Sequence, residues 1–154
     1  MTDPLMKVRL DHLEELKAHG IDPYPARVPA VEPIGGVIEC HADDGPEEKV
    51  MVAGRLVSFR RMGKASFFDL RDGSGKIQAH ATLDGLGEEG YSLLCASDIG
   101  DFLSVSGPVF RTKRGELTVG VEEWTFLAKA IRPLPEKWHG LKDVELRHRH
   151  RSLD

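Results

Sequence analysis

The sequence has few of the features that mark exported, membrane-spanning or metal-binding proteins. Its two cysteines, Cys40 and Cys95, do not form a pair with metal-ligand spacing, and we predict free thiols and no metal site. No run of 18 apolar residues is present, so no membrane-spanning helix and no membrane partner are predicted. The first ten residues lack the apolar centre of a signal peptide. We therefore expect a cytoplasmic protein.

Acidic and basic residues are distributed unevenly along the chain. The 154 residues are 40% hydrophobic and 30% charged, which is typical of a globular protein, and the formal net charge is −4. Residues 37–48 contain five acidic and no basic side chains, whereas residues 50–80 contain six basic and two acidic ones. Because local field matters more than net charge to a polyanion, residues 50–80 suit a nucleic-acid partner; a solvated charged surface is the alternative.

Apolar spacing and turn residues predict the order of secondary structure. Residues 5–19 have helical spacing and Gly20 at their end, which predicts an N-terminal amphipathic helix. A Pro- and Gly-rich connector follows, and residues 1–48 are assigned to this helix and connector. Gly54 suits a first strand that bends or bulges. A helical pattern over 88–97 separates the third strand from the fourth; the predicted strands are 49–60, 65–72, 76–83, 102–112 and 116–129.

This order of elements is typical of the OB-fold, a five-stranded Greek-key barrel with a helix between strands three and four. Its exposed face commonly binds single-stranded nucleic acid. We therefore predict a mainly β protein with an OB-fold barrel over residues 49–130, small barrels of other topologies being the alternative. Residues 131–154 contain two early prolines and no second apolar core. We interpret them as a linker segment, with a short basic helix beginning near Asp143.

The alternation of side chains along the second strand separates two neighbouring phenylalanines. Phe68 is predicted to enter the core, so Phe67 points outward. The same period of two places Gln78 on the third strand and Glu116 on the fifth strand outside. An outward ring can stack on a base, an amide can read a base edge, and an arginine such as Arg60 can hold a phosphate. A lone exposed phenylalanine without function is the alternative.

Four stretches, in order along the chain, carry a family resemblance. They are RLDHLEELKAHGIDPYP (9–25), VAGRLVSFRRMGKASFFDLRDGSGKIQ (52–78), DIGDFLSVSGPVFRTKRGELTV (98–119) and IRPLPEKWHGLKDVELRHRHRSLD (131–154). Together they resemble the N-terminal, anticodon-binding part of bacterial-type class II lysyl-tRNA synthetases. The fourth stretch is the most distinctive, because it is similar to the connection between the barrel and the catalytic domain of that family.

The resemblance implies an OB-fold that recognises the uridine-rich anticodon loop of tRNA(Lys). By position, Phe67 matches the family aromatic that stacks on an anticodon base, and Gln78 matches the amide that reads a base edge. Arg60 and Glu116 match polar residues of the same pocket. Further basic residues complete the candidate nucleic-acid-binding set: Arg61, Lys64 and Lys113, with Arg111 and Arg114 as weaker candidates for backbone contacts.

The resemblance also implies recognition rather than catalysis. The family binds ATP, lysine and magnesium in a catalytic domain that begins where this sequence ends, so we expect no cofactor and no aminoacylation from this chain alone. Family members are homodimers. Departures from common family residues occur at His148, His150 and Ser152. Two other functions stay open: a free-standing binder of single-stranded nucleic acid, and a protein-interaction or dimerisation module.

Overall fold

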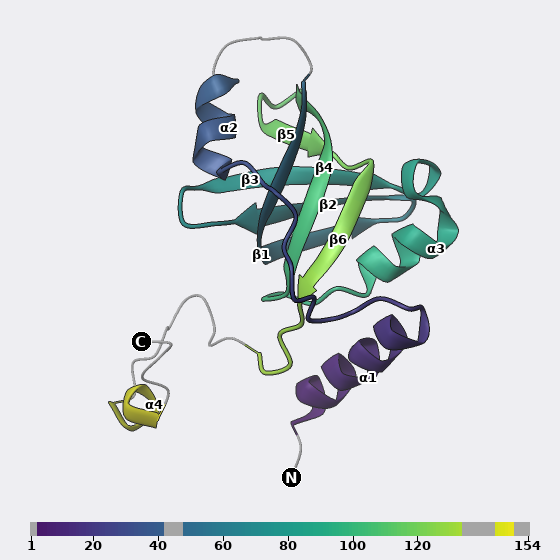
Figure 1. Ribbon diagram of the computed structural model, residues 1–154, viewed down its shortest axis with the longest axis vertical. Helices are drawn as coiled ribbons and strands as arrows, with labels where there is room; N and C mark the ends of the chain where they lie inside the picture. Colours follow the sequence, from purple (N-terminus) through teal and green to yellow (C-terminus); the bar gives the residue numbers. More distant parts are fainter. Residues whose placement is uncertain (1–2, 42–47, 134–143, 150–154) are drawn as a thin grey trace.

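Six strands form one sheet in the computed structural model, which describes residues 3–41, 48–133 and 144–149 (Figure 1). They are β1 (Lys49–Met62), β2 (Ala65–Arg71), β3 (Lys76–Thr82), β4 (Phe102–Arg111), β5 (Leu117–Gly120) and β6 (Glu123–Ala128). Their order in the sheet is β1-β2-β3-β5-β4-β6, and β1 also pairs with β4, which closes β1 to β5 into a barrel. The pairing of β3 with β5 is parallel. This topology confirms the predicted OB-fold.

The predicted fifth strand is interrupted and forms both β5 and β6. β5 pairs with β3 and β4, whereas β6 continues along β4. Between them the N–H of Val121 donates to the carbonyl of His80 at 2.9 Å. Gly107 on β4 allows this crossing, because a Cβ there would lie 1.7 Å from the carbonyl oxygen of Gly120. The interruption therefore follows from a close approach of two backbones, which the pattern of one strand does not reveal.

Two helices pack on the barrel from different sides (Figure 1). Helix α3 (Leu83–Cys95) starts earlier than the predicted 88–97 and buries Leu94 in the core. Helix α2 (Ile34–Cys40) lies in the predicted connector and buries Ile34 in the same core. The N–H of Ile34 donates to Asp72 in the β2–β3 turn at 2.9 Å. Gly35 leaves no room there, since a Cβ would lie 2.9 Å from the carbonyl oxygen of Ser74.

The predicted N-terminal helix is confirmed as α1 (Pro4–Ala18), with Asp3 as its N-cap. Polar contacts join α1 to the barrel: the guanidinium of Arg9 donates to the carbonyl of Ala130 at 2.8 Å, and Nδ1 of His12 lies 2.9 Å from Asp98 Oδ2. These contacts hold the helix against the end of β6 and the loop before β4.

A short helix, α4 (Val144–Arg149), occurs where the basic helical turn is predicted, and His148 lies on it, exposed. Asp143, His150 and Ser152 lie outside the described residues. Within the described part of the chain, no helix has the length and apolarity to cross a membrane.

A buried ion cluster lies where α1, β4 and β6 meet. Nζ of Lys129 is 2.8 Å from Asp101 Oδ2 and also contacts Asp98, and the side chains of Lys129 and Asp101 are fully buried. Asp101 also accepts from the N–H of Ala130 at 2.8 Å. Burial alone would raise the pKa of Asp98, but hydrogen bonds from His12 and Lys129 outweigh it and lower that pKa. The cluster thus joins three separate segments through charge-assisted hydrogen bonds.

We predict that Lys129→Met lowers the free energy of unfolding by about 3–5 kcal/mol, because Asp98 and Asp101 lose a buried partner. Chemical denaturation at neutral pH measures the change. The matched control is Lys49→Met, which removes an exposed ion pair with Glu122 at 2.7 Å and should leave the denaturation midpoint unchanged. Equal midpoints for the two variants would show that the cluster does not stabilise the fold.

Candidate nucleic-acid interface

Cross-strand pairing assembles rows of side chains on the outer face of β1, β2 and β3. The first row contains directly paired residues, Arg60, Phe67 and His80. The second row lies two positions further along and contains Ser58, Asp69, Gln78 and Thr118, the last on β5. Because paired residues project to the same side of a sheet, each row presents its side chains together.

A register shift in β1 turns Arg60 toward this outer face. The shift lies between Leu56 and Ser58, so Val57 is an extra residue relative to β2. It occurs three positions after Gly54, the residue at which the sequence predicts a bend or bulge. Gly54 itself is needed for close packing, since a Cβ there would lie 2.7 Å from the carbonyl oxygen of Arg71.

Phe67 forms the centre of a stacked group. Its ring lies 4.5 Å from the ring of His80 between centroids, with 29° between the ring planes, and Cζ of Arg60 lies 5.9 Å from its centroid. The neighbouring Phe68 is only 1% exposed, which confirms that it enters the core while Phe67 points outward. Burial against this stack lowers the pKa of His80, because desolvation opposes the charged imidazolium.

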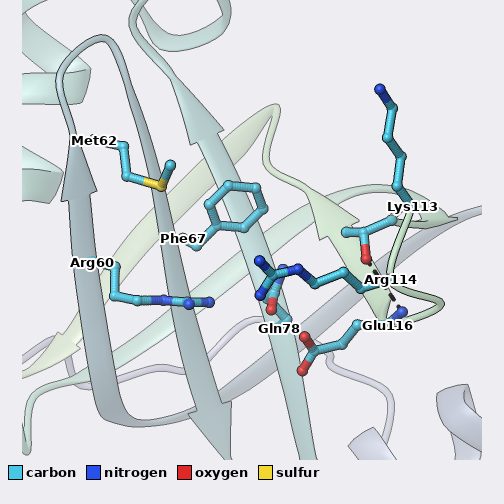
Figure 2. Close-up of a pocket in the computed structure, with 8 residues that line it drawn as sticks. Arg60, Met62, Phe67, Gln78, Lys113, Arg114 and Glu116 are labelled. Atoms are coloured by element: carbon cyan, nitrogen blue, oxygen red, sulfur yellow. Dashed lines mark hydrogen bonds between the residues drawn. The ribbon is translucent and has the colours of Figure 1, made fainter.

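An open pocket of about 290 Å³ lies beside Phe67. In Figure 2, Arg60 and Met62 approach it from β1, while Lys113, Arg114 and Glu116 come from the loop between β4 and β5. The side chain of Arg114 extends toward Phe67 and Gln78, whereas that of Lys113 points away from the ring. The lining residues are Arg60, Met62, Phe67, Gln78, Thr112, Lys113, Arg114 and Glu116.

Gln78 projects toward this pocket from β3 and has a fixed orientation. Its Nε2 donates to Thr118 Oγ1 at 3.3 Å, and the Thr118 hydroxyl donates to the carbonyl of Glu116 at 3.1 Å. Because the hydroxyl proton is used on Glu116, Thr118 can only accept from Gln78, which fixes the amide with its nitrogen toward Thr118. Gln78 faces outward as predicted, but it is only 5% exposed, since Thr118 and the pocket side chains surround it.

The structure brings together five of the seven residues that the sequence indicated for nucleic-acid binding. These are Arg60, Phe67, Gln78, Lys113 and Glu116. The pocket also includes Arg114, which was a weaker candidate, and two residues that sequence analysis did not select, Met62 and Thr112. Met62 pairs with Ala65 beside the Arg60 row, so correct strand pairing would have identified it.

Three predicted basic residues lie elsewhere or have protein partners. Arg61 pairs with the buried Ser66 and is therefore on the other face of β1; its guanidinium donates to the carbonyl of Cys95, with Nε at 3.0 Å. Lys64 lies in the turn between β1 and β2 and does not line the pocket. Arg111 donates to the carbonyl of His41 at 2.7 Å and so connects β4 to the end of α2.

The chemistry of the pocket suits a planar, polar and negatively charged ligand. The ring of Phe67 provides a stacking surface, Gln78 and Glu116 provide hydrogen-bonding groups, and the three cations Arg60, Lys113 and Arg114 outnumber the one carboxylate. An unpaired nucleotide has these properties. Across residues 3–41, 48–133 and 144–149, no group of three or more His, Cys, Asp or Glu side chains is placed to hold a metal ion.

A closed OB-fold barrel with such a face defines a class of nucleic-acid-binding domain. Residues 50–127 match the tRNA anti-codon family, described as the OB-fold nucleic acid binding domain, and the chain belongs to this family.

Full-length relatives give a more specific similarity. The chain is 47% identical over 150 residues to a lysine–tRNA ligase from Moorella thermoacetica and 45% identical over 150 residues to one from Pelotomaculum thermopropionicum. It is 42% identical over 155 residues to the lysine–tRNA ligase of Bacillus subtilis. Each comparison covers 97% of this chain but only 29% to 31% of the relative. The predicted resemblance is confirmed, and the chain spans about 30% of the length of these curated relatives.

The lowered pKa of His80 gives a direct test of the stack. We predict that NMR titration finds this pKa below the ordinary 6.5, and that Phe67→Ala raises it toward that value because water regains access to the imidazole. Tyr24→Leu removes an aromatic ring remote from the stack and should leave the titration unchanged. A His80 pKa that is the same with and without the Phe67 ring would contradict desolvation by this contact.

Proposed function

We propose that this chain recognises the unpaired anticodon loop of tRNA(Lys), as the anticodon-binding module of a lysine–tRNA ligase. The observation that carries the proposal is the Phe67 stack beside the Gln78 amide, in a cationic pocket of an OB-fold nucleic acid binding domain. The similarity to lysine–tRNA ligases supports the identity of the RNA. In the complete ligase this module would act in the cytoplasm, in a homodimer whose catalytic domain carries out aminoacylation.

Stacking is the first step of recognition in this proposal. A base enters the pocket and lies against Phe67, with the guanidinium of Arg60 close enough to contact the base or its phosphate. His80 supports the opposite side of the Phe67 ring and stays neutral at neutral pH, because its pKa is lowered. The ring is therefore held in place before the RNA arrives, which reduces the entropy lost on binding.

Hydrogen bonding then selects the base. Uracil has two carbonyl acceptors and one N–H donor on its polar edges, and the pocket offers the complementary groups. Gln78 and Arg114 can donate to the carbonyls, while the carboxylate of Glu116 can accept from the N–H. Cytosine carries an amino donor in place of one carbonyl, so it would leave a donor of the pocket unpaired. The arrangement therefore favours the uridine-rich lysine anticodon.

The proposal predicts selective binding that depends on Phe67. In titrations with two hairpin RNAs, one with the lysine anticodon loop and one with its uridines replaced by cytidines, wild type should bind the lysine loop more tightly. Phe67→Leu should weaken that binding by about 5- to 150-fold, which corresponds to the loss of ~1–3 kcal/mol of base stacking. The matched control, Tyr24→Leu, removes an exposed ring that is bonded to the carbonyl of Lys129, and should bind like wild type.

Other outcomes would identify the alternative functions. Equal affinity of wild type for both RNAs would indicate a sequence-tolerant binder of single strands, because stacking accepts every base. Absence of binding to either RNA, even at low salt, would reject RNA recognition by this module and favour a protein-interaction role. An equal loss in Phe67→Leu and Tyr24→Leu would reject the pocket as the site.

A further inference from the structure

A third row on the outer face has no part in the pocket. It contains three basic residues that pair directly across the sheet, Arg55 on β1, Arg71 on β2 and Lys76 on β3. We call these three residues the cationic row. On β4, Phe102 pairs with Arg55, and Cζ of Arg55 lies 4.9 Å from the centre of its ring. This contact holds the Arg55 guanidinium over β4 by a cation–π interaction.

The cationic row is not neutralised by the protein. Within the described residues, none of its three side chains forms an ion pair or a side-chain hydrogen bond, and Arg71 and Lys76 are exposed. Two acidic residues lie near Arg71 on β2 and in the turn after it, but both have other partners. Asp69 accepts from the hydroxyl of Ser58 at 2.7 Å, and Asp72 accepts from the N–H of Ile34 at 2.9 Å.

Such an arrangement is unfavourable for the free protein. Like charges directly opposite each other on neighbouring strands destabilise a sheet. Exposed lysines elsewhere in the chain have acidic partners, as Lys49 does in Glu122 and Lys17 in Glu14. A row of unneutralised cations creates a positive potential that a polyanion can relieve.

The position of the row points to one polyanion. It lies on the same outer face as the pocket, because the register shift in β1 brings Arg55 and Arg60 to one side. Arg71 is four residues from Phe67 on β2, a distance of ~13 Å along a strand. OB-folds engage ~4–16 nucleotides of a single strand, more than one pocket holds. A strand with one base against Phe67 can therefore pass over the row.

We propose that the cationic row binds the sugar–phosphate backbone of the RNA strand whose base occupies the pocket. This inference rests on the proposed function and adds a second contact surface to it. Phosphate contacts position a strand and strengthen its binding, but they do not distinguish bases. The row therefore supplies salt-dependent affinity, whereas the pocket supplies base selection.

The test is the salt dependence of RNA binding by the double variant Arg71→Gln/Lys76→Gln. Affinities for the lysine-loop hairpin and its cytidine counterpart are measured between 50 and 200 mM salt. Each lost phosphate contact on a single strand lowers the slope of log K against log salt by about 0.7, so the slope should become about 1.4 less steep. The affinity ratio between the two RNAs should stay at its wild-type value.

The matched control is Lys7→Gln/Lys17→Gln, which removes the same charge from exposed positions on α1 and should keep the wild-type slope. Both double variants are first shown to have the wild-type denaturation midpoint. Equal slopes in wild type and Arg71→Gln/Lys76→Gln, or equal reductions in both double variants, would overturn the cationic row. Because base preference is measured separately, a wild type without preference for the lysine loop would contradict the proposed function, while a reduced slope would still support the row.

Discussion

The composition of the outer face depends on one extra residue in β1. Arg55 and Arg60 are five positions apart, and in a regular strand an odd separation places two side chains on opposite faces. The register shift between Leu56 and Ser58 changes this relation, so Leu56 and Phe59 both face the core side while both arginines face outward. Without it, either Arg60 would leave the Phe67 row or Arg55 would leave the cationic row. A single bulge thus determines which cations can meet one ligand.

The loop that forms the far wall of the pocket is fixed from two directions. Within the loop, the N–H of Thr112 donates to the carbonyl of Glu116 at 3.0 Å, and the N–H of Glu116 donates to Oγ1 of Thr112 at 3.2 Å. From outside, Arg111 connects the base of the loop to the carbonyl of His41 at the end of α2. Helix α2 lies outside residues 50–127, so a segment beyond the matched barrel helps to position the site.

Side-chain alternation was sufficient to predict the centre of the site but not its limits. The period of two correctly separated Phe67 from Phe68, because this distinction depends only on neighbouring residues. The direction of Arg61 could not be predicted, since it depends on the β1 register shift. Helix α2 was missed because its fit beside the β2–β3 turn requires Gly35, which also lowers helix propensity. The break between β5 and β6 likewise depends on a backbone contact between residues far apart in the sequence.

A chain with a formal charge of −4 can present a cationic surface because neighbouring groups decide what each cation does. The charge of Lys129 is buried with two carboxylates and stabilises the fold, and that of Lys49 is offset by Glu122. Arg71 and Lys76 have no such partner among the described residues and remain available to an anion. Net charge therefore predicts little about the partner, whereas the distribution of unpaired cations over one sheet face indicates where a nucleic-acid strand would lie.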